Sequence, residues 1–161
     1  MPELKAVLFD VYGTLAGFDP PREQIQAQAL ERFGLKVTAS GIDAGYHMAD
    51  EFMTRQNSTK PVRTMNGNEQ WEFFARFEQL VLKGAGHKVD LTHAGEIWSE
   101  VRKQEYRIAL FPDVIDGLEG LREAGLIVGV VSNMNSTSQR LCDDMGLTGH
   151  VDFAVTSGET R

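Results

Sequence analysis

The residues that could do chemistry gather in two short stretches of the chain. In the first, "LFDVYGTL", the carboxylate of Asp10 follows an apolar run and precedes a Gly13-Thr14 turn. In the second, "VGVVSNMN", the hydroxyl of Ser132 and the amide of Asn133 follow another apolar run. A carboxylate can bind or attack a ligand, whereas hydroxyl and amide groups can donate hydrogen bonds to an anion.

Both stretches are predicted to lie at the ends of buried parallel strands. The short apolar runs at residues 4–9 and 126–131 are bounded by turn residues, which is typical of strands covered on both faces. A third run covers residues 151–157, and the alternation of these runs with helical patterns predicts an α/β fold with a parallel sheet. Because ligands bind beyond the carboxyl ends of such strands, we expect Asp10 and Ser132 to border one crevice.

Two helices are predicted beside these core strands. One begins after Asp113 as its N-cap and ends at Gly125. The other begins with Asn135 or Ser136 as its N-cap and ends at Gly146.

The chain between the first two strands has a helical pattern. It is far longer than the connection of a βαβ unit, which needs only about 30 residues in all, so it is interpreted as an inserted domain. The sequence therefore predicts an α/β core of residues 1–16 and 108–161 and an all-helical cap of residues 17–107. Its helices are expected at residues 22–34, 41–56, 69–86 and 91–106.

Composition excludes several classes of function. The chain has 161 residues and a formal net charge of -7, which argues against a nucleic-acid partner held by a general positive field. It has no apolar run long enough for a membrane span. Cys142 is the single cysteine, so no internal disulfide is expected, and a reducing, cytoplasmic location is predicted. The four histidines lack ligand spacing, so no zinc site is predicted.

These motifs resemble those of the haloacid dehalogenase (HAD) superfamily. "LFDVYGTL" looks like motif I of that family, and "VGVVSNMN" is similar to its motif II. The predicted insertion lies where the family has its helical cap, so the resemblance covers nearly the whole chain. It implies a Rossmann-like core and a hydrolase that acts on a small anionic substrate.

The resemblance implies a role for each residue at the strand ends. Asp10 would be a covalent nucleophile whose ester intermediate is then hydrolysed. Thr14 would hold the carboxylate in line, and Gly13 would let the backbone turn close to the substrate, where N–H groups can cradle an anion. Ser132 and Asn133 would donate hydrogen bonds to the substrate anion, helped by the start of the next helix. Taken singly, Asp10 also fits the role of a turn residue, and Ser132 and Asn133 also fit the role of a helix N-cap.

Tyr12 leaves two reactions open. Phosphatases of this family usually carry there an aspartate that protonates the leaving group, whereas a phenol with a reference pKa of about 10 is a poor proton donor at neutral pH. Halide leaves without a proton, so an aromatic residue at this position resembles the pattern of the dehalogenase subgroup. The alternative is that Tyr12 only packs beneath the cap. A dehalogenase would need no metal and would use a cap arginine, for which Arg55, Arg63 and Arg76 are candidates. A phosphatase would hold Mg²⁺ through Asp10.

The resemblance also implies site residues beyond Arg161, a lysine and then an acidic motif. Three explanations stay open: a longer protein, a short product that dimerises to cover a bare sheet edge, or a folded remnant without activity that acts as a binding or interaction module. The predicted partners are a small anionic substrate and a second copy of the chain, with no nucleic acid and no membrane.

Overall fold

The computed structural model describes residues 4–159, and the chain separates into two compact units. The core unit combines Met1–Asp19 with Arg107–Arg161, and the helical unit is Pro20–Tyr106.

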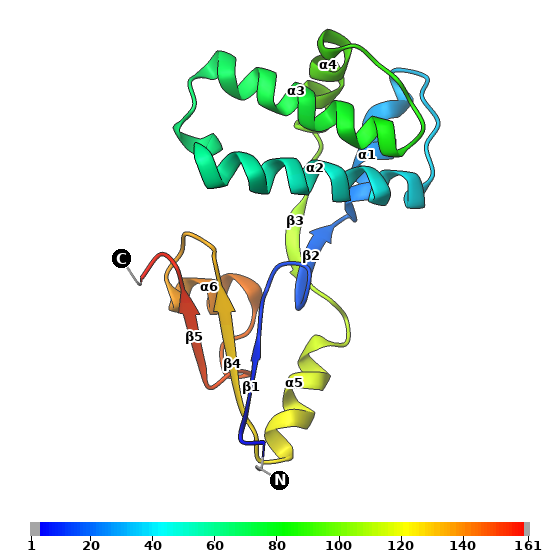
Figure 1. Cartoon of the computed structure of the whole chain (residues 1–161). Helices are drawn as coiled ribbons and strands as arrows, with labels where there is room; N and C mark the ends of the chain where they lie inside the picture. The colour runs from blue at the N-terminus through cyan, green and yellow to red at the C-terminus, as the bar shows by residue number, and fades with distance from the viewer. Residues whose placement is uncertain (1–3, 160–161) are drawn as a thin grey trace. The chain divides into compact units, whose positions relative to one another are not determined.

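The core unit contains a parallel sheet, which confirms the predicted α/β fold class (Figure 1). Its strands run in the order β1-β4-β5 and are β1 (Ala6–Phe9), β4 (Ile127–Ser132) and β5 (Phe153–Thr156). Phe9 lies level with Val130, and Ser132 lies level with Thr156. The carboxyl ends of all three strands therefore share one edge of the sheet.

Two short strands that the sequence pattern does not predict form a second, antiparallel sheet. They are β2 (Ala16–Asp19) and β3 (Arg107–Leu110). Gly and Asp are depleted in strands, which is why β2 resembles a loop in sequence. An ion pair of 2.7 Å between Arg107 Nη2 and Asp19 Oδ2 joins their outer ends. The segment expected to be helical, residues 17–107, thus begins and ends with strand residues.

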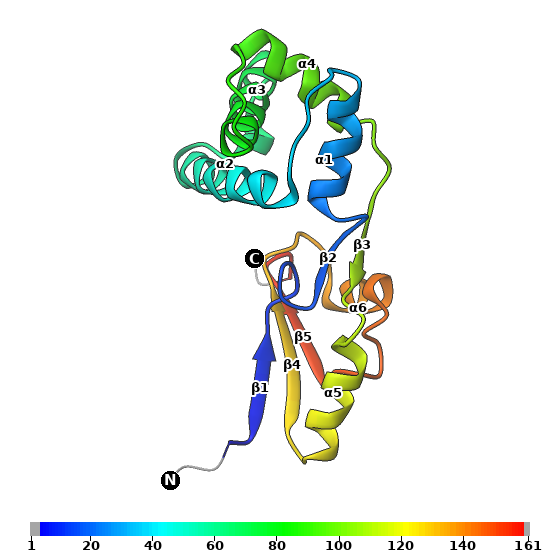
Figure 2. The same cartoon turned by 90° about the vertical axis from the view of Figure 1, so that its right-hand side faces the viewer.

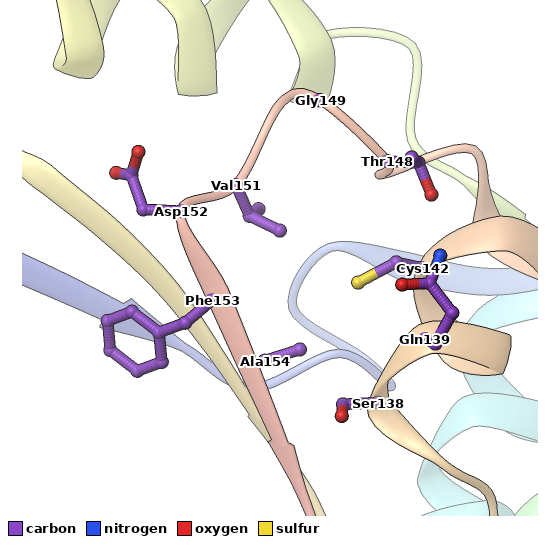
Figure 3. Close-up of a pocket in the computed structure, with 9 residues that line it drawn as sticks. All are labelled: Ser138, Gln139, Cys142, Thr148, Gly149, Val151, Asp152, Phe153 and Ala154. Carbon is purple, nitrogen blue, oxygen red and sulfur yellow. The ribbon is translucent and has the colours of Figure 1, made fainter.

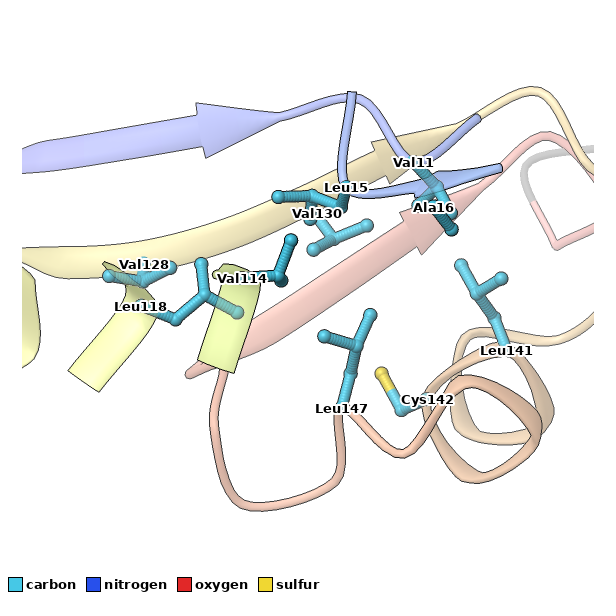
Figure 4. Close-up of a cluster of buried hydrophobic side chains, with 10 residues drawn as sticks. All are labelled: Val11, Leu15, Ala16, Val114, Leu118, Val128, Val130, Leu141, Cys142 and Leu147. Atoms are coloured by element: carbon cyan, nitrogen blue, oxygen red, sulfur yellow. The ribbon is translucent and has the colours of Figure 1, made fainter. Parts of the chain in front are cut away.

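Two helices, α5 (Val114–Glu123) and α6 (Ser138–Met145), pack on one face of the parallel sheet (Figure 2). The N-cap of α6 is Thr137, whose hydroxyl accepts the N–H of Arg140, so the expected caps Asn135 and Ser136 are wrong by one or two residues. The core between helices and sheet is drawn in Figure 4 and consists of Val11, Leu15, Ala16, Val114, Leu118, Val128, Val130, Leu141, Cys142 and Leu147.

The opposite face of the parallel sheet is apolar and exposed. Leu8 and Phe153 lie so close over Gly129 that a Cβ at that glycine would overlap both side chains. Parallel sheets are normally covered on both faces, and an edge strand such as β1 presents unpaired backbone groups. The exposed large side chains of these strands are Leu8, Ile127, Val131, Phe153 and Val155.

The helical unit is built from four α-helices and one 3₁₀ turn. A buried cluster at its centre contains Leu30, Ile42, Val81, Leu82 and Ile97. No helix in residues 4–159 combines the length and the apolar character that crossing a membrane requires. The elements are α1 (Arg22–Glu31), α2 (Ala39–Thr59), η1 (Val62–Thr64), α3 (Gly67–Gly84) and α4 (Leu91–Val101).

Helices α2 and α3 approach each other through glycines. A Cβ at Gly45 would lie 2.1 Å from the carbonyl oxygen of Val81, and one at Gly84 would lie 2.2 Å from the Cα of Gly45. Both clashes involve backbone atoms, which cannot move aside as a flexible side chain can. The spacing of the two helices therefore requires the absence of side chains at these positions.

A buried carboxyl group links α1 to α3. Glu78 is 2% exposed and accepts a hydrogen bond from Gln26 Nε2, while Tyr46 donates its hydroxyl proton to Gln26 Oε1 over 3.2 Å. Burial raises the pKa of Glu78 to about 8, although the Gln26 hydrogen bond opposes the shift. The folded chain therefore keeps this carboxyl group protonated at neutral pH.

We predict that the stability of the helical unit falls as pH rises from about 4.5 to about 8. In this window the folded state binds one proton more at Glu78 than the unfolded state, so the free energy of unfolding decreases by up to about 1.4 kcal/mol per pH unit. Glu78→Gln should flatten this dependence. Urea unfolding between pH 5 and pH 9, followed by tryptophan fluorescence, measures it, because Trp71 and Trp98 both lie in the helical unit.

The matched control is Glu72→Gln, an exposed carboxylate on the same helix that pairs with Arg76. Its pH dependence should follow that of the unsubstituted chain. Equal pH slopes for Glu78→Gln and the unsubstituted chain would contradict the assignment.

Candidate active site

The strand register brings the two predicted stretches to the same edge of the parallel sheet. Asp10 directly follows Phe9, which lies level with Val130 in β4. Ser132 is the last residue of β4, two positions beyond Val130. Because β1 and β4 are adjacent and parallel, the carboxylate and the hydroxyl lie at neighbouring strand ends.

The turn after Asp10 is held by its own backbone. The carbonyl of Val11 accepts the N–H groups of Leu15 and Ala16, each over 2.9 Å, and Gly13 donates its N–H to the carbonyl of Ala16 over 2.8 Å. The N–H of Gly13 is therefore engaged within the turn and is not directed to a ligand. With φ at +81°, Gly13 contributes to the candidate site through its conformation.

Most side chains of this turn are exposed, although Val11 beside Asp10 is buried. Val11 is fully buried in the core, whereas Asp10 and Thr14 are exposed, and no hydrogen bond joins these two side chains within residues 4–159. Tyr12 is 44% exposed and meets the ring of Phe18 edge-on, with 5.5 Å between ring centroids. The turn thus presents a carboxylate and a phenol to its surroundings.

Ser132 is 4% exposed, and its hydroxyl oxygen accepts the N–H of Met134 over 3.3 Å. A hydroxyl group can accept and donate at once, so its own proton is available to an anion at the strand end. Asn133, the next residue, is exposed. Anion binding by these two groups stays a prediction.

Sequence reasoning missed two hydroxyl residues at the end of β5. Thr156 donates to the carbonyl of Ser136 over 2.6 Å, and Ser157 donates to the carbonyl of Asn133 over 2.9 Å. The available signal was their position, because Thr-Ser ends the third predicted strand as Ser132 ends the second.

Cys142 belongs to the core and not to this edge. Its sulfur points from α6 toward β5 beside a surface cavity of about 210 Å³ (Figure 3). Burial, followed by the charge of Asp143, raises the pKa of this thiol, which disfavours the reactive thiolate. None of the predicted site residues lines the cavity, whose walls are Ser138, Gln139, Cys142, Thr148, Gly149, Val151, Asp152, Phe153 and Ala154.

The three candidate arginines differ in their surroundings within the helical unit. Arg55 and Arg76 each pair with a glutamate one turn earlier in the same helix, Glu51 and Glu72. Arg63 lies in η1 and is exposed.

The described residues do not complete a Mg²⁺ site around Asp10. Magnesium is usually held by one or two carboxylates together with water and substrate phosphate. Within residues 4–159 no group of three His, Cys, Asp or Glu side chains could hold a metal ion. Glu159, which follows β5, is hydrogen-bonded to Ser138. Among these residues Asp10 is thus the one candidate carboxylate ligand at the strand ends.

We predict that Gly13→Ala destabilises the core unit by about 1 kcal/mol, because a Cβ strains the backbone at positive φ. The effect is one of conformation alone, since nothing lies within 4 Å of the added atom. Gly117→Ala is the control: it is an equally open glycine, but it lies inside α5 and should be neutral or stabilising. Urea unfolding measures both, and an equal effect of the two substitutions would contradict the prediction.

Comparison with known proteins identifies the family. The family model for haloacid dehalogenase-like hydrolases matches residues 4–161. A ribulose-1,5-bisphosphate 5-phosphatase of Halopiger xanaduensis is 30% identical over 159 residues, which cover 96% of this chain and 64% of that protein. An uncharacterized hydrolase of Schizosaccharomyces pombe is 21% identical over 96% of this chain and 66% of that protein. A solved L-2-haloacid dehalogenase is 19% identical with a TM-score of 0.48, over 96% of this chain and 64% of that one. This chain thus spans about two thirds of the length of these relatives, and it belongs to the haloacid dehalogenase-like hydrolase family.

Proposed function

We propose that Asp10 is the covalent nucleophile of a hydrolase and that Ser132 and Asn133 bind the anionic group of its small substrate. The proposal is carried by one observation, the placement of Asp10 and Ser132 at the carboxyl ends of adjacent parallel strands. Membership of the hydrolase family supports it independently.

The proposed reaction has two steps. With a 2-haloacid as the substrate, an oxygen of the Asp10 carboxylate forms a bond to the carbon that bears the halogen. The carbon–halogen bond breaks, and its electron pair leaves on the halide. Water then adds to the aspartyl ester carbonyl and the acyl–oxygen bond breaks. One proton of the water goes to the departing oxygen of the 2-hydroxy acid and the other is released to solvent, which restores the Asp10 carboxylate. The hydrogen bonds from Ser132 and Asn133 hold the substrate carboxylate in line throughout.

Tyr12 supports a 2-haloacid as the substrate. Halide leaves as a stable anion, so the first step needs no proton donor at this position. A phosphate monoester expels an alkoxide, which needs the general acid that a carboxyl group would supply. The edge-on contact of the Tyr12 ring with Phe18 fits a side chain that shapes the site.

A phosphate monoester is the second candidate substrate. It is favoured by the 30% identity to a ribulose-1,5-bisphosphate 5-phosphatase. In that case Mg²⁺ would be the cofactor and Asp10 one of its ligands, with further ligands from outside the described residues. A folded but inactive binding module is the remaining alternative.

We predict that the chain releases halide from 2-chloropropionate without added metal, and that Asp10→Asn lowers this rate by about 10³-fold or more because the nucleophile is lost. Asp116→Asn, an exposed carboxylate on α5, is the matched control and should keep full activity. Ion chromatography of released chloride measures the rate.

The same samples are tested with 4-nitrophenyl phosphate and Mg²⁺. If the unsubstituted chain releases phosphate and Asp10→Asn does not, the substrate is a phosphate monoester and not a 2-haloacid. Turnover that survives Asp10→Asn would overturn the nucleophile, and no turnover of either substrate would favour the binding module.

We also propose that a second copy of the chain covers the free edge of β1 and the adjacent apolar face, and that the protein is cytoplasmic. Light scattering after gel filtration should then give twice the chain mass of 17.9 kDa. Leu8→Lys should shift the protein toward monomer by placing a charge on the apolar face, whereas Tyr106→Lys, exposed in the helical unit, should not. A monodisperse monomer at every concentration would contradict the dimer.

A further inference from the structure

The end of β5 is tied to the loop that follows β4. Thr156 and Ser157 reach this loop, residues 133–137, through both side chain and backbone. Besides the two hydroxyl hydrogen bonds to the carbonyls of Ser136 and Asn133, the backbone N–H of Ser157 donates to the carbonyl of Ser132 over 3.0 Å. Together these contacts cover the loop from its first residue to its fourth.

The next residues extend the same junction. A Cβ at Gly158 would lie 2.5 Å from the carbonyl oxygen of Ser136, so the two segments are in backbone contact. Ser138, at the start of α6, donates its hydroxyl proton to Glu159 over 2.5 Å. The segment after β5 therefore follows the loop up to the first residue of the helix.

The Thr156 side chain is buried, unlike the other side chains of this junction. Thr156 is 1% exposed, so its hydrogen bond forms away from water, where electrostatic interactions are less screened. Because the acceptors are loop carbonyls, these hydroxyl groups orient the backbone from which Ser132 and Asn133 project.

We propose that Thr156 and Ser157 are positioning residues for anion binding by Ser132 and Asn133. The inference rests on the proposed function, since it acts through these two groups. The hydroxyl of Ser132 is itself placed by the N–H of Met134, so a displacement of the loop would redirect the proton that Ser132 offers to the anion. The loop also lines a surface cavity of about 560 Å³, together with Arg140, Asp144 and Gly158.

The test is an NMR titration of the ¹⁵N-labelled chain with two probes, sodium lactate and inorganic phosphate. In the unsubstituted chain, the amide signals of Ser132, Asn133 and Met134 should shift on addition of at least one probe. Thr156→Val and Ser157→Ala should each raise the dissociation constant about tenfold, because loss of a hydrogen bond that orients the site is worth about that factor. Thr156→Ser keeps the hydroxyl group and should restore binding.

Thr148→Val is the matched control. It removes a hydroxyl group of the core unit that donates to Asp143 over 2.6 Å, outside the junction, and should leave the dissociation constant unchanged. Because binding is measured on folded protein, a purely structural role of Thr156 would lower the thermal midpoint without altering affinity.

The outcomes separate the two proposals. If the unsubstituted chain shifts these amides but both variants bind within twofold of it, positioning by Thr156 and Ser157 is overturned and the anion site stands. If neither probe shifts the amides of the unsubstituted chain, the anion site itself is overturned, and the positioning role with it.

Discussion

The core unit depends on the parallel hydrogen bonding of β1, β4 and β5. This pairing places Asp10 and Ser132, which are far apart along the chain, at one edge of a sheet. A slip of one residue would turn every side chain of a strand to the opposite face, so the buried side chains of β4 also fix the register. The packing of Val128 and Val130 under α5 and α6 thus determines which groups lie at this edge of the sheet.

Local patterns predicted much of this fold. The continuous apolar run of β4 and the helical spacing of α3 each indicated the correct element, because burial on both faces or along one stripe leaves a clear signature. The pair β2 and β3 was missed because each strand has only four residues and β2 contains Gly17 and Asp19. Its stability comes from pairing between distant segments, which a local pattern does not contain.

The candidate site was predictable to the same extent. Asp10, Ser132 and Asn133 could be named because each comes directly after an apolar run that predicts a strand. The hydrogen bonds of Thr156 and Ser157 could not, since they depend on how β5 aligns with β4. The hydrogen bond from the Gly13 N–H to the carbonyl of Ala16 was also beyond local patterns, since it depends on how the turn closes on itself.

The glycine contact between α2 and α3 has a mechanical consequence. At this crossing backbone meets backbone, so rotation of α2 about its axis would drive the side chain of Ala44 or Tyr46 into the carbonyl of Val81. Interfaces packed in this way do not deform gradually. We therefore expect α2 and α3 to move together, as one rigid body, in any rearrangement within the helical unit.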